Sequence, residues 1–347
     1  MNDFFKKHIK VYPEIFPNKV TENPLVSVAV QTYQHSKYIK DCLDGILMQQ
    51  TDFPFEVLLG EDESTDGTRD VCIEYAKKYP DKIRLFLHSR KNVIFINNRP
   101  TGRFNLLWNF ENANGKYIAW CDGDDYWTDP LKLQKQADFL ENNSDYGLTH
   151  TDCAVYVENK KKWLKSINKN LSNQNNDLNK KELFYELIKS TYKVRTSTAM
   201  FRKDLLSGII INNYFAMVDT QVWLTMSQKT KFKYFDEVTC VYRKLQNSLS
   251  RDGLSINTFR FRLSSSEMRI YYCKLFKYKI NTAIKNKYNN QLITYKIYKN
   301  DFKEKYPLIN PTFIQKIRNN VIKINIIRSI LRFEHQLRKK IYFLINS

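Results

Sequence analysis

The stretch that decides the fold is NGKYIAWCDGDDYWTDP, residues 114–130. Its short apolar run, 117–121, predicts a buried strand. The run ends in three carboxylates within four residues: Asp122, Asp124 and Asp125. Carboxylates this close repel one another unless a cation neutralises them, and Mg²⁺ is commonly held by one or two carboxylates together with substrate phosphates. A solvated acidic turn between a strand and a helix is the alternative, and this stretch alone leaves both interpretations open.

The segments before this stretch alternate between strand and helix patterns. Apolar, β-branched runs at 24–33, 55–60 and 83–88 predict buried strands, and the segments 36–50 and 68–80 between them predict helices. Such alternation predicts βαβ units, and therefore an α/β fold with a mostly parallel sheet flanked by helices.

Beyond the acidic stretch the pattern continues. A helix is expected at 131–143, a strand at 146–157, an inner strand at 196–201, and a strand at the sheet edge at 233–243.

Each of the four predicted parallel strands ends in polar residues. These ends are 31–33, 61–62, 88–91 and 122–125. Because ligands bind at the carboxyl ends of the strands in sheets of this kind, we expect the four ends to meet in one crevice. Their convergence is better evidence for a binding site than any single motif.

The net charge of +20 is concentrated in the C-terminal region. Residues 256–347 hold 20 Lys and Arg against 4 Asp and Glu, a charge of +16, so the rest of the chain carries only +4. Segments with helical periodicity there mix apolar and aromatic residues with Lys and Arg. This region predicts contact with a polyanionic surface, either an anionic membrane or a nucleic acid. Packing on the preceding domain and a homodimer interface are the other interpretations.

Cysteine usage and the N-terminus indicate the compartment. The six cysteines are scattered and include no CxxC pair, so neither a zinc site nor a disulfide framework is indicated, which fits a reducing cytoplasm. Residues 1–23 contain no apolar core of a signal peptide, and no stretch approaches 18 uncharged apolar residues. A cytoplasmic protein is therefore expected, with 1–23 as a loosely packed extension.

Several motifs, in a fixed order, now resemble a known family. They are VSVAVQTY at 26–33, FEVLLGEDESTDGT at 55–68, GKYIAWCDGDDYW at 115–127, VDTQVWLTMS at 218–227 and VYRKLQNSLS at 241–250. Together they resemble the bacterial family 2 glycosyltransferases of the GT-A fold, and most closely the enzymes of capsular polysaccharide or lipopolysaccharide biosynthesis.

The resemblance covers roughly 24–250 and sets the expected organisation. Residues 1–23 form an N-terminal extension, 24–255 the GT-A catalytic domain, and 256–347 a basic helical C-terminal region.

The resemblance implies a nucleotide-sugar donor. Thr32 and Tyr33 match the residues beside the nucleotide base. Asp62 matches the carboxylate that reads the imide of uracil, and this favours UDP over other nucleotides.

It also implies an inverting transfer that depends on Mg²⁺ or Mn²⁺. Asp122 and Asp124 match the DxD motif, the first near the ribose and the second on the metal that bridges the diphosphate. Asp125 matches an adjoining carboxylate near the sugar. Asp219 matches the general base that takes a proton from the acceptor hydroxyl.

The chain departs from the family pattern at three places. At the end of the first strand the family commonly has Pro, and this chain has Gln31. After the second strand the family commonly has two consecutive Asp residues, and this chain has Glu61 in place of the first. The usual YRxH motif reads YRKL at 242–245 and lacks its His. Either Arg243 or Lys244 supplies charge there, or the metal is held by the second DxD carboxylate, the diphosphate and water.

One further cation is open to two interpretations. Arg103 closes a basic, Asn-rich loop at 89–103, where contact with a phosphate and a solvated position fit equally well.

The expected function is therefore transfer of a sugar from a nucleotide-sugar to a saccharide or lipid-linked saccharide acceptor in surface polysaccharide biosynthesis. The enzyme would lie in the cytoplasm, with a possible peripheral position on the inner face of the membrane through 256–347. The alternative is a nucleic-acid-binding protein that uses the same basic region. That alternative leaves the acidic strand end unexplained, because clustered carboxylates repel a phosphate backbone, so no nucleic acid partner is expected.

Overall fold

The computed structural model describes residues 2–21, 23–164, 178–245, 255–299, 308–309, 311–321, 329 and 331–336. The chain divides into two compact units, Met1–Leu245 and Gln246–Ser347. The expected end of the catalytic domain, residue 255, directly follows the segment 246–254, which lies outside the described residues.

Ten described strands of the N-terminal unit form one sheet, in the order β1-β4-β3-β2-β7-β11-β9-β12-β8 with β10 beside β9. The strands are β1 (Glu14–Ile15), β2 (Val26–Thr32), β3 (Phe55–Glu61), β4 (Ile83–Leu87), β7 (Tyr117–Asp122), β8 (Tyr126–Trp127), β9 (Tyr146–Val157), β10 (Lys162–Leu164), β11 (Met200–Arg202) and β12 (Lys231–Lys244). The neighbours β4, β3, β2 and β7 are parallel, as are β9 and β12, whereas β1, β8, β10 and β11 pair antiparallel. The predicted α/β fold, with parallel strands at its centre, is confirmed. A separate hairpin joins β5 (Ile94–Ile96) to β6 (Arg99–Thr101).

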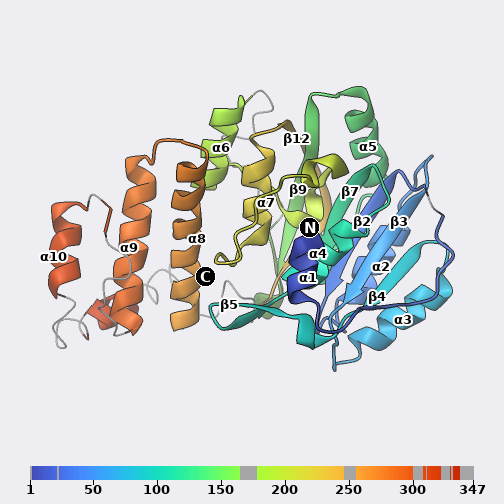
Figure 1. The fold of residues 1–347 in the computed structure, drawn as a ribbon, viewed down its shortest axis with the longest axis horizontal. Helices are drawn as coiled ribbons and strands as arrows, with labels where there is room; N and C mark the ends of the chain where they lie inside the picture. Colours follow the sequence, from blue (N-terminus) through green and yellow to red (C-terminus); the bar gives the residue numbers. More distant parts are fainter. Residues whose placement is uncertain are drawn as a thin grey trace. The chain divides into compact units, whose positions relative to one another are not determined.

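Helices cover both faces of this sheet (Figure 1). They are α1 (Asn2–His8), α2 (Ile39–Leu47), α3 (Thr68–Lys78), α4 (Arg103–Glu111), α5 (Lys132–Asn142), α6 (Lys180–Lys189) and α7 (Val218–Met226). α2, α3 and α5 share one apolar core with the strands: Ile39, Cys42, Leu43 and Ile46 of α2, at helical spacing, pack against alternate residues of β2 such as Val28.

The opposite face is covered by α1, α4 and α7. Asn105 and Asn109 of α4 are buried, and their side-chain amides donate hydrogen bonds of 2.8 Å to the backbone carbonyls of Gly60 and Val30. These bonds satisfy buried polar groups on both partners and fix α4 against β3 and β2.

An aromatic pair on this face positions the N-terminus of α7 relative to the sheet. Trp120 of β7 and Trp223 of α7 are both buried, with ring centroids 5.8 Å apart. Asp122 lies two residues after Trp120, and Asp219 lies one helical turn before Trp223. The tryptophan contact therefore brings the N-terminus of α7 towards the acidic end of β7.

The N-terminal extension is not loosely packed, contrary to the expectation for residues 1–23. β1 extends the sheet beside β4, and Phe5 of α1 is buried with edge-on contacts to Phe104 and Trp108 at centroid distances of 5.6 and 5.4 Å. The Asn92 side-chain oxygen accepts hydrogen bonds from the backbone N–H groups of Lys10 and Val11 at 2.8 and 3.0 Å. A seven-residue helix and a two-residue strand are too short to produce a periodic pattern, so no pattern in the sequence indicates this packing.

The C-terminal unit contains the helices α8 (Ile256–Leu275), α9 (Thr282–Lys299) and α10 (Phe313–Val321) among its described residues. The rings of Phe259 in α8 and Tyr298 in α9 pack in a tilted arrangement with their centroids 4.2 Å apart, and the Asn289 side chain of α9 donates to that of Gln315 in α10 at 3.1 Å. The helices expected for this basic region are present, and part of their apolar surface is used within the unit. Among the helices that the structure describes, none has the length and apolar character that a membrane crossing demands.

We predict that Phe5→Ala lowers the free energy of unfolding by about 3 kcal/mol, because a phenyl ring is removed from a packed site. Urea denaturation measures the change. Tyr12→Ala, at an aromatic side chain that is 77% exposed, is the control and should stay within about 0.5 kcal/mol of wild type. Equal, small effects of both substitutions would mean that α1 does not pack as described.

Candidate active site

The polar ends of the four central strands meet, as the sequence predicts. Gln31 and Asp122 are register partners at the ends of β2 and β7, and the Gln31 side-chain amide donates to Asp122 Oδ1 at 2.7 Å. Asp62, just after β3, pairs with Arg90 in the loop after β4, with 2.6 Å between Arg90 Nη1 and Asp62 Oδ2. These contacts create one polar edge along the sheet.

One end of this edge combines an aromatic ring, a cation and a carboxylate. The Arg90 guanidinium lies 4.0 Å from the ring centroid of Tyr33, whose side chain is 38% exposed. The Asp62 backbone N–H donates to the Thr32 carbonyl at 3.1 Å. Burial raises the pKa of the Asp62 carboxyl to about 6, although Arg90 opposes the shift. The three residues expected beside the nucleotide base are therefore together, and Arg90 joins them.

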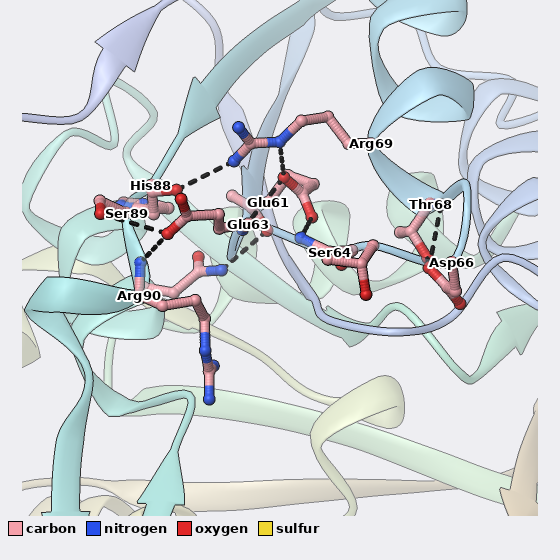
Figure 2. Close-up of polar contacts among 12 residues, drawn as sticks. Glu61, Glu63, Ser64, Asp66, Thr68, Arg69, His88, Ser89 and Arg90 are labelled. Carbon is pink, nitrogen blue, oxygen red and sulfur yellow. Dashed lines mark hydrogen bonds and ion pairs between the residues drawn. The ribbon is translucent and has the colours of Figure 1, made fainter.

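A network of carboxylates holds the Arg90 loop in place (Figure 2). The buried Glu61 carboxylate pairs with Arg69 at 2.5 Å, and Arg69 also donates to the His88 carbonyl at 2.9 Å. Glu63 accepts a hydrogen bond from the backbone N–H of Arg90. Glu61, where the chain departs from the family pattern, therefore has a structural role: through Arg69 it anchors the loop that carries Arg90.

At the other end, Asp122 is fixed by three donors. Its Oδ1 accepts from Gln31 Nε2 at 2.7 Å and from Trp120 Nε1 at 3.0 Å, and its Oδ2 accepts from the Thr196 hydroxyl at 2.7 Å. Neither Gln31 nor Thr196 was expected to hold this carboxylate. Thr196 reaches it from 74 residues away in the chain, and no local sequence signal reports such a contact.

Asp125 is enclosed by the protein. Its side chain is fully buried, Oδ1 accepts from the Arg243 backbone N–H and Oδ2 from the Ser197 hydroxyl, both at 2.8 Å. Burial and the neighbouring carboxylates raise its pKa well above the usual range. In this arrangement Asp125 connects the turn after β7 to β12, and its predicted place beside the sugar stays a prediction.

Arg243 is likewise engaged by the protein. Its guanidinium donates to the Asp124 carbonyl at 3.0 Å and pairs with Asp41. Of the two cations proposed to replace the missing His, Arg243 therefore has its charge paired within the protein.

The Asp124 carboxylate differs from its neighbours. It is half-buried, and it makes no hydrogen bond or ion pair with another of the described residues. Burial raises its pKa, His35 opposes the shift, and Asp122 adds to it. A carboxylate held beside a like charge without a partner fits a divalent cation.

The number of protein ligands also bears on the metal. No three His, Cys, Asp or Glu side chains of the described residues are grouped to hold a metal ion. A cation here would take Asp124, diphosphate oxygens and water, which is the ligand set Mg²⁺ prefers in nucleotide sites. The residues present therefore fit the predicted Mg²⁺ or Mn²⁺.

Asp219 lies in the first turn of α7, with its Oδ1 3.4 Å from the Thr220 hydroxyl. Burial raises its pKa, and the negative charge of Asp122 raises it further, while Arg195 lowers it. Asp219 and Asp122 are thus close enough for their charges to interact. A carboxylate with a raised pKa is suited to accept a proton.

Arg103 positions the loop that leads to Asp219. Its side chain is buried, and its guanidinium donates to the Asn213 side chain at 2.9 Å and to the Phe215 carbonyl at 2.6 Å. A solvated position for Arg103 is therefore wrong, and its donors are directed to protein groups instead of a phosphate.

The sequence model of "Glycosyl transferase family 2" matches residues 27–208, slightly more than half of the chain. The chain belongs to this family. The enzyme class expected from the sequence motifs, a glycosyltransferase, is confirmed with it.

Two curated relatives illustrate the range of similarity. TuaG of Bacillus subtilis, named as a teichuronic acid biosynthesis glycosyltransferase, is 26% identical over 228 residues, 65% of this chain and 82% of TuaG. An uncharacterized protein of Mycobacterium bovis is 38% identical over 120 residues, 35% of this chain, and the match spans only 32% of that protein's length.

A solved structure shares the fold. The crystal structure of S. aureus TarS 1–349 in complex with UDP-GlcNAc superimposes with a TM-score of 0.50 and 18% identity, covering 86% of this chain and 79% of that one. At this identity the likeness concerns the fold alone.

We predict that binding of UDP weakens as the pH falls below about 6, because protonation removes the negative charge that makes Asp62 a strong acceptor for the N–H of the base. Arg90→Gln removes the cation that favours the ionised form, so the weakening should begin at a higher pH. Calorimetric titration of UDP from pH 5 to pH 8 measures both.

The control for this prediction is Lys77→Gln, which removes an equal charge from the exposed side of α3. Its pH profile should match that of wild type. Equal affinity of the wild-type protein at pH 5 and pH 7.5 would contradict the assignment of Asp62.

Proposed function

We propose that this protein is a metal-dependent, inverting glycosyltransferase that uses a nucleotide-sugar donor. The observation that carries the proposal is the Asp124 carboxylate, which has no partner among the described residues and lies next to the firmly held Asp122. The half-buried Asp219 lies within electrostatic reach of Asp122. The residue proposed for the donor, Asp122, is therefore near both the residue proposed for the metal, Asp124, and the proposed base, Asp219.

The donor we propose is a UDP-sugar. Tyr33 offers an aromatic surface to the base, and Asp62 offers an acceptor for the imide N–H of uracil. TarS, which has a similar fold, holds UDP-GlcNAc in its crystal structure, and this supports a nucleotide-sugar as the donor class.

The proposed chemistry needs few protein groups. A divalent ion at Asp124 would stabilise the negative charge that develops on the diphosphate leaving group. Asp219 accepts the proton of the acceptor hydroxyl as that oxygen attacks the anomeric carbon from the side opposite the diphosphate. A single displacement of this kind inverts the anomeric configuration, and no covalent intermediate on a side chain is required.

The acceptor we propose is a saccharide or lipid-linked saccharide in surface polysaccharide biosynthesis at the inner face of the cytoplasmic membrane. The name of TuaG supports this class of pathway. The charge of +16 on residues 256–347 supports association with anionic headgroups. The nucleic-acid alternative finds no support in the family match.

The deciding experiment is a donor panel of UDP-, GDP- and dTDP-sugars with Mn²⁺, Mg²⁺ or EDTA. We expect metal-dependent release of nucleoside diphosphate from one donor, and its loss in Asp124→Ala. Asp70→Asn, on the exposed side of α3, is the control and should behave as wild type. Failure of the folded wild-type protein to bind any nucleotide-sugar in the presence of metal would refute the proposal.

Asp219→Asn tests the base. We expect the transfer rate to fall roughly 10²–10⁴-fold, because general base catalysis contributes on that scale. UDP affinity should stay within about twofold of wild type, since Asp219 serves the acceptor in this mechanism. Asp138→Asn, on the exposed side of α5, is the matched control. Comparable losses of UDP affinity and of rate would place Asp219 in the donor site instead.

A further inference from the structure

Arg195 is a cation at the site whose hydrogen-bonding groups are not used by the protein. Its guanidinium lies 4.7 Å from the ring centroid of Tyr242, yet it forms no hydrogen bond or ion pair with any residue in the described part of the chain. Its Nε is shielded from solvent. Arg202 and Arg243, by contrast, each donate to at least two protein oxygens. An unpaired buried donor costs free energy that a bound acceptor would recover.

The surroundings of Arg195 place it at the proposed reaction centre. The next residue, Thr196, opens the 3₁₀ segment Thr196–Thr198 and donates its hydroxyl to Asp122. The Arg195 charge also lowers the pKa of Asp219, although the two side chains form no ion pair. Arg195 is therefore next in sequence to a residue that binds Asp122, and it is near enough to Asp219 to affect its pKa.

A second positive charge lies nearby. Lys193 is two residues before Arg195 in the chain. Burial lowers the pKa of Lys193, and the positive charge of Arg195 lowers it further. Two cations that disfavour each other in the free protein are both stabilised when an anion binds between them or beside them.

We propose that Arg195 forms an anion subsite of this active centre and binds a phosphate oxygen of a ligand. The proposal rests on the proposed function. The guanidinium offers its donors in a planar fork that matches two oxygens of one phosphate, and stacking on Tyr242 holds the plane of the fork. The charge of Arg243 is paired with Asp41, so Arg195 supplies the positive charge for a phosphate in its place.

Two sources could provide this phosphate. One is the diphosphate of the donor, beside Asp124, and the other is a phosphate of a lipid-linked acceptor, beside Asp219. The chemistry recognised at Arg195 is the same, so the experiment has one arm for each source.

The first arm measures the affinity of uridine, UDP and inorganic pyrophosphate in the presence of Mg²⁺, by calorimetry or ligand-observed NMR. The variants are Arg195→Gln, which removes the charge, and Arg195→Lys, which keeps the charge but not the fork. Lys189→Gln, at an exposed position of α6, is the control for net charge. If the donor is the source, Arg195→Gln weakens UDP and pyrophosphate at least tenfold and leaves uridine unchanged, while Arg195→Lys restores part of the affinity.

The second arm measures KM for a phosphate-bearing acceptor. Unchanged UDP and pyrophosphate affinity with a KM for the acceptor raised at least tenfold in Arg195→Gln assigns the subsite to the acceptor. Wild-type values in both arms overturn the proposal. Should Arg195→Gln fail to fold, Arg195→Met, which also removes the charge and keeps an apolar stem, takes its place, and wild-type values for that variant in both arms overturn the proposal equally.

The same probes separate this proposal from the proposed function. Binding of pyrophosphate that depends on Arg195, without binding of any nucleotide-sugar, refutes the function and supports the anion subsite. A folded wild-type protein that binds none of the probes and accepts no phosphate-bearing acceptor refutes both.

Discussion

Electrostatic repulsion between carboxylates at one edge of the sheet is the constraint on which this structure depends. Parallel strands bring their carboxyl ends together, so acidic residues at those ends are forced into proximity. Each is accommodated differently: Asp62 pairs with Arg90, Asp122 accepts from three neutral donors, and Asp125, whose burial favours the neutral carboxyl, accepts from two donors. The exception is Asp124, whose carboxylate has no partner among the described residues, and the proposed function depends on it.

Packing within the protein sets the position of Asp219, the proposed base. Trp120 and Trp223 are in contact across the sheet face, and Arg103 holds the turn that precedes α7. The side chains of Trp120, Trp223 and Arg103 are buried, and Trp120 also donates a hydrogen bond to Asp122. Because interiors are close-packed, a change of volume or charge there would displace Asp219, so these residues matter for function through position.

The segments outside the family match are joined to the fold in different ways. Asn92, which binds the backbone of the N-terminal extension, follows Arg90 by two residues, so the extension supports the loop that carries Arg90. The C-terminal unit builds its own helix contacts, for example between Phe259 and Tyr298. Its described elements are all helices, and its charge of +16 also distinguishes it from the rest of the chain.

The sequence by itself determined the α/β class, the succession of strands and helices up to the acidic stretch, and the meeting of polar strand ends, because periodicity is a local property and parallel strands place their carboxyl ends at one edge. It also identified Asp62, Asp122 and Asp124 as neighbours of one crevice. Only the tertiary structure decided which carboxylates are already paired and which is free. The hydrogen bond from Thr196 to Asp122 and the pairing of Arg243 with Asp41 join segments that are far apart in the chain. The same packing leaves the Arg195 guanidinium without a hydrogen bond or ion pair to any residue that the structure describes. Such contacts follow from packing in three dimensions, and no local pattern encodes them.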